Sequence, residues 1–281
     1  LTFGTNGFHL EFKQTGVGSG ATDTIGADTS GEDNHLDSAV IAADDCNMPD
    51  CPENNFCVLS ATSNQQAATL SEGSLKFNGT GNDTDNIQST FGVSTGKWYW
   101  EVKCLSIQQA ESWVAGIHQT GFPPIQLHWY HGNYSAAAAG VAFGIQDNDK
   151  KNTNTSQGTF TASIAAGDVV QLRLDLDDNE LSISVDGTDK GKLYDITAGI
   201  EYTPAVLAYN TSSGICNFGQ DSTFGGTETA TTNSDENGFG AFHSAVPSGY
   251  LALCTRNLPE PNIGPNSDDG NSTDFFDTVL Y

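Results

Sequence analysis

The chain of 281 residues is long enough to bury a sizeable core in one or two domains, and its 35 acidic against 10 basic residues leave a net charge of −25. This charge would repel a phosphate backbone and an anionic lipid surface alike, which excludes nucleic acid as an expected partner; its plainest interpretation is solubility or adaptation to a salty medium. No apolar run of about 18 residues predicts insertion into a membrane, and no leader pattern follows Leu1.

Residues 1–13, LTFGTNGFHLEFK, predict a pair of strands around the turn at Gly4 to Gly7. At the other end, FFDTVLY at 275–281 predicts a strand with nothing after it. Because a terminal strand needs a hydrogen-bonding partner, we expect the chain to be a segment of a larger, multidomain protein. The expected parts are the end of a preceding β module with an ordered linker (1–60), a β-sandwich (61–222), and a loop-rich connector with the first strand of a following module (223–281).

The six cysteines are expected to be free thiols: Cys46, Cys51, Cys57, Cys104, Cys216 and Cys254. Cys104 and Cys216 lie in strand patterns and are predicted to be buried as small hydrophobes. The spacing of the first three, C-x4-C-x5-C, lacks a fourth nearby ligand and the short knuckle of a structural zinc site, so no zinc is expected. A bridge between Cys46 and Cys51 is the alternative for that pair.

The segment GKWYWEVKC at 96–104 predicts a half-buried strand, because two sets of side chains alternate along it. One face carries Trp98, Trp100, Val102 and Cys104, and the other carries Tyr99, Glu101 and Lys103. The first face is predicted to line the core.

The segment GDVVQLRLDLDDNELSISVDG at 167–187 predicts a β-hairpin. The turn residues Asp177, Asp178 and Asn179 separate two alternating runs, and Asp186-Gly187 supplies the next turn. The side chains expected to point inward are Val170, Leu172, Leu174, Leu176, Leu181, Ile183 and Val185, and those expected to point outward in the first run are Gln171, Arg173 and Asp175.

These strands belong to a longer series of blocks that resembles the SPRY domain. As they stand here, the blocks are GKWYWEV, SWVAGI at 112–117, VAFGIQDNDKKN at 141–152, the hairpin, YTPAV at 202–206 and NFG at 217–219. The resemblance implies an all-β fold, an antiparallel two-sheet β-sandwich of the SPRY/concanavalin-like jelly-roll type with long loop-rich flanks. It also implies a module that binds a partner rather than transforming a substrate. The extra N-terminal strands of some eukaryotic relatives are not recognisable, so their peptide-binding pockets are not carried over.

The flanks carry a second resemblance. GTNGFHLEF, SGEDNH and NNFCVLS before the sandwich, and PSGYLALCTRNLPEPNI and FFDTVLY after it, are similar to the joints of bacteriophage tail-fibre or appendage proteins, especially marine ones, in which a laminin-G-like, concanavalin-type module precedes a SPRY-like one. This implies a virion structural protein, displayed outside the particle and assembled in the host cytoplasm without a leader. The implied partners are other virion proteins and a host-surface glycan or protein, with no membrane insertion. The implied assembly is a homo-oligomer, with a trimer expected for a fibre.

The stretch from 220 to 274 has the polar composition of a linker, with runs such as GGTETATTNSDENG. Apolar residues nonetheless punctuate it. We expect these to dock on the sandwich and to order the segment: Phe239, Phe242, Val246, Tyr250, Leu251 and Leu253.

The segment FPPIQLHWYHGNY at 122–134 is the candidate binding site, because aromatic rings over a polar rim suit a carbohydrate or a peptide. The candidate residues are His128, Trp129, Tyr130, His131 and Tyr134. Large aromatics line cores and interfaces more often than ligand sites, so packing as a lid or against a neighbouring subunit is the competing and favoured interpretation. His128 and His131 have no third ligand nearby, so no metal is expected there.

Carboxylates cluster at Asp175, Asp177, Asp178 and Glu180, where turn chemistry is preferred to calcium because the twelve-residue loop arrangement is missing. The loop at 234–238, SDENG, remains as a place for a structural calcium ion. Glu101 and Asp175 would serve a concanavalin-like glycosidase as acid and nucleophile if they faced one cleft. The sequence has no G-x-S-x-G, H-E-x-x-H or phosphate-binding glycine loop, so no catalytic residue, metal or cofactor is expected.

Three functions are compatible with these patterns. The first is adhesion, in which sandwich loops bind a host-surface glycan or protein through many weak contacts multiplied by copy number. The second is an architectural spacer or capsid-decorating protein that contacts only other virion subunits. The third, a minority interpretation, is a depolymerase that acts on surface polysaccharide.

Overall fold

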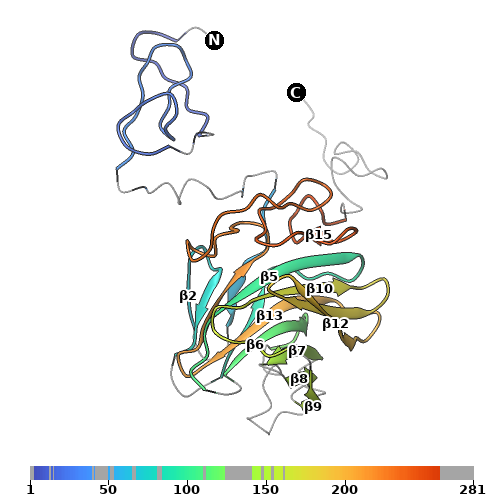
Figure 1. The fold of residues 1–281 in the computed structure, drawn as a ribbon. Helices are drawn as coiled ribbons and strands as arrows, with labels where there is room; N and C mark the ends of the chain where they lie inside the picture. Colours follow the sequence, from blue (N-terminus) through green and yellow to red (C-terminus); the bar gives the residue numbers. More distant parts are fainter. Residues whose placement is uncertain are drawn as a thin grey trace, which may run out of the picture. The chain divides into compact units, whose positions relative to one another are not determined.

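The computed structural model describes residues 3–12, 14, 16–39, 41, 50, 54–64, 68–80, 84–109, 112–123, 141–146, 149–152, 155–160 and 162–259. The chain divides into two compact units, residues 1–50 and residues 51–281 (Figure 1). Within these described ranges, regular structure consists of strands, and no helix is long and apolar enough to cross a membrane.

The larger unit is a sandwich of two β-sheets, and the predicted all-β fold class is confirmed. One sheet has the strand order β1-β4-β13-β6-β7-β8-β9 and the other the order β12-β11-β10-β5-β14-β3-β2, with antiparallel neighbours throughout. The strands are β1 (Leu59–Asn64), β2 (Thr69–Ser71), β3 (Lys76–Asn78), β4 (Thr84–Ser89), β5 (Lys97–Ser106), β6 (Trp113–Gln119), β7 (Ala142–Gln146), β8 (Asp149–Asn152), β9 (Thr155–Thr159), β10 (Val169–Asp175), β11 (Glu180–Val185), β12 (Thr188–Asp195), β13 (Tyr202–Tyr209), β14 (Ser213–Asn217) and β15 (Leu251–Ala252).

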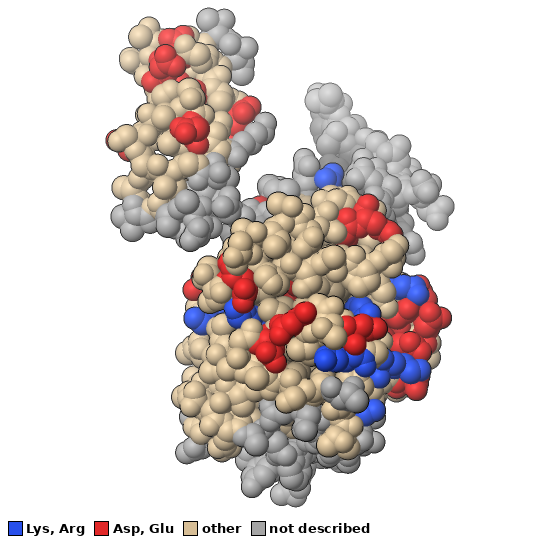
Figure 2. Space-filling view, in the orientation of Figure 1, with Lys and Arg blue, Asp and Glu red and all other residues tan. Residues whose placement is uncertain are grey.

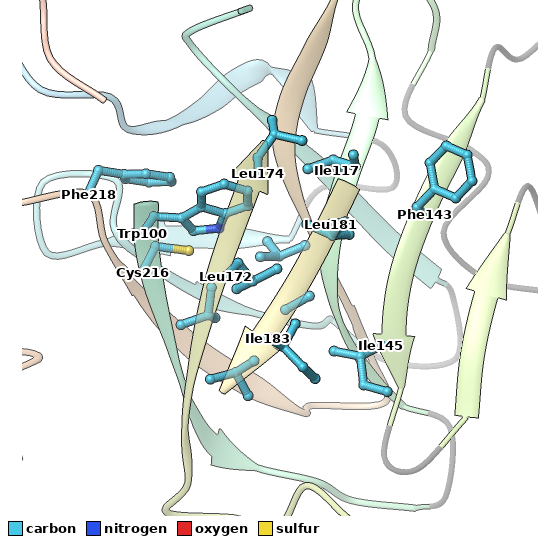
Figure 3. Close-up of a cluster of buried hydrophobic side chains, with 14 of the residues drawn as sticks. Trp100, Ile117, Phe143, Ile145, Leu172, Leu174, Leu181, Ile183, Cys216 and Phe218 are labelled. Atoms are coloured by element: carbon cyan, nitrogen blue, oxygen red, sulfur yellow. The ribbon is translucent and has the colours of Figure 1, made fainter. Parts of the chain in front are cut away.

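The predicted inner faces meet in one core between the sheets (Figure 3). Trp100 of β5 and Leu172 of β10 enter it from one sheet, and Ile117 of β6 and Phe143 of β7 enter it from the other. Every residue predicted to face the core in β5 and in the hairpin is buried there: Trp98, Trp100, Val102, Cys104, Val170, Leu172, Leu174, Leu176, Leu181, Ile183 and Val185.

The predicted hairpin is also confirmed. β10 and β11 pair from Val170 opposite Val185 to Asp175 opposite Glu180. Its turn places Asn179 at φ +59°, a left-handed backbone that asparagine tolerates better than most residues. The next turn uses Gly187 at φ +72°, as the Asp-Gly signal predicts.

β5 is not the half-buried strand that its alternation predicts. The residues on its outer face, Tyr99, Glu101 and Lys103, are buried, and so is Gln171 beside them on β10. The chain after β14 returns across this face, and the ring of Phe242 packs on that of Tyr99 with 5.1 Å between the centroids. The alternation therefore shows which side chains share a face. The outer face is buried by residues far along the chain, in the segment after β14.

The apolar residues that punctuate the stretch after β14 dock on the sandwich as expected. Phe239, Phe242, Val246 and Tyr250 join the outer cluster around Tyr99, and Leu251 and Leu253 join the main core. β15 runs parallel to β5, with Leu251 opposite Trp98 (Figure 1). It thereby occupies the flank of β5 beyond Asn217, the last residue of β14.

The two ends of the described sandwich unit are joined to each other. Phe56 forms an isolated β-bridge with Cys254. The N–H of Cys57 donates to the carbonyl of Leu253 (2.8 Å), and the N–H of Thr255 donates to the carbonyl of Asn55 (2.9 Å). Residues 54–58 are thus held by the segment that covers β5.

Residues 3–12, the described part of the segment around Gly4 to Gly7, do not form the strand pair that was predicted there. The turn itself is present, since the N–H of Gly7 donates to the carbonyl of Gly4 (2.6 Å). The segment after it meets Asp28 through an isolated bridge at Leu10 instead of pairing with the residues before the turn.

The cysteines in the described residues are free and buried: Cys57, Cys104, Cys216 and Cys254. Burial raises the pKa of Cys57 and Cys216, so both remain protonated and act as small hydrophobes. The prediction for Cys104 and Cys216 is confirmed. Cys46 and Cys51 lie outside the described residues, as do residues 275–281.

Candidate interaction surface

The strand register gathers several connections at one end of the sandwich, called here the loop end. In one sheet, β10 finishes where β5 starts, with Asp175 opposite Lys97. In the other, β13 starts where β6 finishes, with Tyr202 opposite Gln119. The described residues of the loop end are 90–96 between β4 and β5, 120–123 after β6, 176–179 between β10 and β11, and 196–201 between β12 and β13.

Asp175 holds the β10–β11 turn at the loop end. Its Oδ1 accepts the N–H groups of Asp177 (3.1 Å) and Asp178 (3.0 Å), and its Oδ2 accepts from Nζ of Lys97 (2.5 Å). Burial acts to raise the pKa of Asp175, but the hydrogen bonds from Lys97 and from the backbone of Asp178 outweigh it and hold that pKa below its usual value. The interpretation of this carboxylate cluster as turn chemistry is confirmed.

We expect Asp175→Asn to lower the free energy of unfolding by about 1.5–3 kcal/mol at pH 7, because the variant keeps an acceptor for the turn but loses the charged partner of Lys97. A carboxyl group whose folded pKa is lowered stabilises the fold above its unfolded value, 3.8, and loses that contribution as the pH falls through the folded value. The difference between variant and wild type should therefore shrink below pH 3.8 in urea titrations.

Asp178→Asn is the control for this prediction, because Asp178 also pairs with Lys97 (3.3 Å) but is largely exposed. Asp178→Asn should lower the free energy of unfolding by less than about 0.5 kcal/mol. Equal losses in the two variants would contradict the role given to Asp175.

Further hydrogen bonds tie the remaining connections together. The N–H of Thr120 donates to the carbonyl of Glu201 (3.0 Å), and its Oγ1 donates to Oε1 of the same residue (2.6 Å). Val93 and Tyr202 exchange two backbone hydrogen bonds of 2.8 and 2.9 Å. The connections after β4, β6 and β12 thus form one hydrogen-bonded frame.

A buried polar group supports the base of the β6–β7 connection. Nε2 of Gln88 lies 2.8 Å from Nδ1 of His118 and donates to the carbonyl of Phe122 (3.0 Å). Burial lowers the pKa of His118, so its ring is neutral at pH 7. At the other end of the connection, the carbonyl of Val141 accepts the N–H of Gln119 (2.8 Å). Both described ends of the connection are therefore fixed at the loop end.

The predicted binding residues belong to this same connection. They lie outside the described residues: His128, Trp129, Tyr130, His131 and Tyr134. The structure places the described ends of their segment, at Pro123 and Val141, beside the frame formed by Thr120 and Glu201.

The carboxylate of Glu101 forms a buried polar network that the alternation did not reveal. Its Oε1 accepts from Oη of Tyr99 (2.9 Å) and from the N–H of Ser244 (2.7 Å). Its Oε2 accepts from Nδ2 of Asn217 (3.1 Å) and from the N–H of His243 (2.9 Å). Burial raises the pKa of Glu101 even though these donors act to lower it. Glu101 therefore anchors the returning segment to the sheet.

Glu101 and Asp175 do not face one cleft as a glycosidase pair. Glu101 lies opposite Gln171, and Asp175 is four residues further along β10, which separates the two positions by roughly 13 Å. Even an inverting pair stands only about 6.5–9.5 Å apart. Glu101 is also fully buried, so this arrangement does not support the depolymerase interpretation.

The loop at 234–238, considered above for calcium, is organised around Asp235. Its Oδ1 accepts the N–H groups of Asn237 (3.0 Å) and Phe239 (2.8 Å), and its Oδ2 accepts the N–H of Ala252 (2.9 Å) and Nδ2 of Asn257 (2.7 Å). Four N–H donors occupy the two oxygens, which is the chemistry of a turn. Among the residues that the structure describes, no group of three or more His, Cys, Asp and Glu is placed to hold a metal ion.

The central strands of both sheets are buried on their outer faces, in contrast to the loop end. Tyr99 and Glu101 lie beneath the returning segment on one sheet, and Val114 and Leu207 are buried on the outer face of the other. At the loop end, Asp178 and other charged side chains remain exposed. Figure 2 shows acidic and basic side chains together in the region of the β10–β11 hairpin, where Lys97 pairs with Asp175 and Asp178, and Lys192 with Glu180 and Asp195.

The sequence model of the SPRY domain matches residues 97–221. Among solved structures, the SPRY domain of human HERC1 is similar at 13% sequence identity and a TM-score of 0.45, covering 56% of this chain and 96% of that one. The PSpry domain of TRIM65 is similar at 13% identity and a TM-score of 0.42, covering 58% of this chain and 89% of that one.

Proposed function

We propose that this chain binds its partner through the loop end of the sandwich, because residues 97–221 match the model of the SPRY domain, and SPRY domains are typically non-catalytic protein-interaction modules. The observation that carries the proposal is that the central strands of both sheets are buried on their outer faces, whereas the loop end presents exposed side chains on a hydrogen-bonded frame. Such a frame loses little conformational entropy when a partner binds.

In this proposal the contacting residues are His128, Trp129, Tyr130, His131 and Tyr134. Their connection begins and ends at the frame, at Phe122 and Val141. The aromatic rings suit the apolar C–H surface of a sugar or a peptide, and the imidazole and hydroxyl groups suit its polar atoms.

The site of action in this proposal is the outside of a bacteriophage particle, in a tail fibre or another surface appendage. The support is the resemblance of the flanking segments, such as GTNGFHLEF and FFDTVLY, to the joints of such proteins. The partner is then a host-surface glycan or protein, and several copies, three in our proposal, multiply weak contacts into firm attachment. The net charge of −25 favours no nucleic-acid partner.

Trp129→Ala tests this function. We expect the variant to lose at least tenfold in affinity for a host-surface glycan array or for host cells, about 1.4 kcal/mol, because the largest ring of the segment is removed. Tyr209→Phe, at a partly buried aromatic residue on the opposite end of β13 from the loop end, is the control and should bind like the wild type. Equal thermal unfolding of all three proteins excludes misfolding, and unchanged binding by Trp129→Ala would refute the proposed site.

An architectural role, in which the chain contacts only other virion subunits, is the second candidate. It is favoured by the apolar side chains that residues 1–50 leave exposed, Phe8 and Phe12 among them. In that case the wild type binds neither the glycan array nor the host cells, and Trp129→Ala changes nothing in that assay. The same experiment therefore separates the two functions.

A further inference from the structure

The large apolar side chains that the structure exposes all lie in the first unit. They are Phe8, Phe12, Val17, Leu36 and Ile41, with Phe8 exposed by 53% and Phe12 by 66%. No such side chain is exposed in the described part of the sandwich unit. Single exposed apolar residues are ordinary, but their concentration in one small unit of an otherwise well-buried chain marks an interaction surface.

The first unit is held together by polar contacts instead of a core. Within its described residues, Ala27 is the one buried apolar side chain. Oδ1 of Asp28 accepts the N–H groups of His9 and Ser30 (both 2.8 Å), and Oδ2 accepts from Oγ of Ser30 (2.8 Å) and from the N–H of Asn34 (2.9 Å). Removing the exposed apolar side chains would therefore leave the contacts that organise the unit in place.

The two most exposed apolar residues, Phe8 and Phe12, belong to one short segment with the partly buried Leu10 between them, called here the apolar row. The backbone of this segment is held at His9, whose N–H donates to Oδ1 of Asp28 (2.8 Å) and whose Nδ1 lies 2.8 Å from Oγ1 of Thr29. Phe12 takes φ +53°, a left-handed conformation that is unfavourable for phenylalanine. The backbone is therefore in an unfavourable conformation at Phe12, the residue whose ring is most exposed.

The charge around the apolar row indicates what covers it. Residues 1–50 contain one basic residue, Lys13, and nine acidic ones: Glu11, Asp23, Asp28, Glu32, Asp33, Asp37, Asp44, Asp45 and Asp50. Acidic side chains stand among the uncharged ones on the face of this unit seen in Figure 2. A second copy of the chain would bring the same excess of negative charge and would be repelled.

We infer that the apolar row is a docking surface for a different protein, one that presents an apolar groove rimmed by lysine and arginine. The rings of Phe8 and Phe12 enter the groove, and the surrounding carboxylates pair with the basic rim. This surface belongs to the first unit and does not depend on the loop end of the sandwich.

The test uses the full chain and three synthetic peptides of equal length: an amphipathic Leu–Lys helix as the probe, a Ser–Lys peptide of the same charge without the apolar face, and a Leu–Glu helix of opposite charge. We expect the Leu–Lys helix to bind at least tenfold more tightly than either control. The double variant Phe8→Ser/Phe12→Ser should lose that tenfold advantage, while Thr5→Ser in the first unit should keep it.

Slow hydrogen exchange at the amides of His9, Ser30 and Asn34 checks that the double variant keeps the fold of the first unit. The inference is overturned if the double variant binds the Leu–Lys helix as the wild type does, or if the Ser–Lys peptide binds equally well, which would reduce the effect to charge. It is also overturned if light scattering shows a dimer that the double variant abolishes, which would assign the row to a second copy. Loop-end binding is read separately through Trp129→Ala, so failure of one proposal leaves the other intact.

Discussion

Glu101→Ala is expected to lower the free energy of unfolding by about 3–5 kcal/mol, because it leaves four buried donors without an acceptor. Two of these donors are the N–H groups of His243 and Ser244, which lie in the segment that covers β5. Hydrogen exchange at these two amides should accelerate more than at the amides of β10. Urea unfolding and exchange mass spectrometry measure the two effects.

Glu101→Gln sharpens the same prediction, with an expected loss of about 1–3 kcal/mol. Both oxygens of Glu101 accept from a backbone N–H, so an amide group in either position faces a donor that cannot reverse its role. Burial raises the folded pKa of Glu101 above its usual 4.5, so the stability this group contributes is greatest below that pH and is lost as the pH rises through the folded value. The advantage of wild type over Glu101→Gln should therefore narrow as the pH rises above 4.5.

Glu180→Gln is the matched control, because Glu180 pairs with Lys192 at a partly exposed position on β11 (2.9 Å). It should change the free energy of unfolding by less than about 0.5–1 kcal/mol. If Glu101→Ala proved no more harmful than this control, the network around Glu101 would have no anchoring role.

Gly116→Ala adds one methyl group and is expected to lower the free energy of unfolding by about 3 kcal/mol, the largest loss we expect from a methyl group added in the sandwich. A Cβ at this position of β6 would lie 2.1 Å from the carbonyl oxygen of Phe143 and 2.6 Å from Cα of Gly144. Both atoms belong to the backbone of the neighbouring strand β7, so relief requires the strands to separate. Thermal and urea unfolding of the purified variant measure the loss.

Gly92→Ala provides the comparison, because the atoms nearest to its Cβ belong to the side chains of Glu201 and Thr120 and not to the backbone of a paired strand. We expect Gly92→Ala to lower the free energy of unfolding by less than about 1 kcal/mol. Similar losses at the two glycines would show that the close approach of β6 to β7 does not govern stability.

Much of the sandwich was predictable because its signals are local. Period-two alternation identifies the core face of β5, from Trp98 to Cys104, and that of the hairpin, from Val170 to Val185. Turn residues such as Asn179 and Gly187 mark the reversals by their tolerance of positive φ. The docking of Phe242 and Tyr250 was also foreseeable, because apolar residues inside a polar stretch need a surface to cover them.

The strand pair predicted within residues 1–13 was wrong, because strand pairing depends on a partner that the local sequence does not identify. A strand exists only through its partner, and the partner of Leu10 is Asp28, across a turn-rich segment whose sequence carries no strand signal. The aromatic segment at 122–134 was identified from composition, and its proposed binding role stays a prediction.

The amino-acid order by itself determined which side chains share a face of each strand and where the chain reverses, because both depend on neighbours a few residues apart. Only the tertiary structure decided that the polar face of β5 is buried and that Glu101 anchors the segment that returns after β14. Those outcomes depend on where the chain returns after β14, and that contact joins residues too distant in sequence for any local pattern to record.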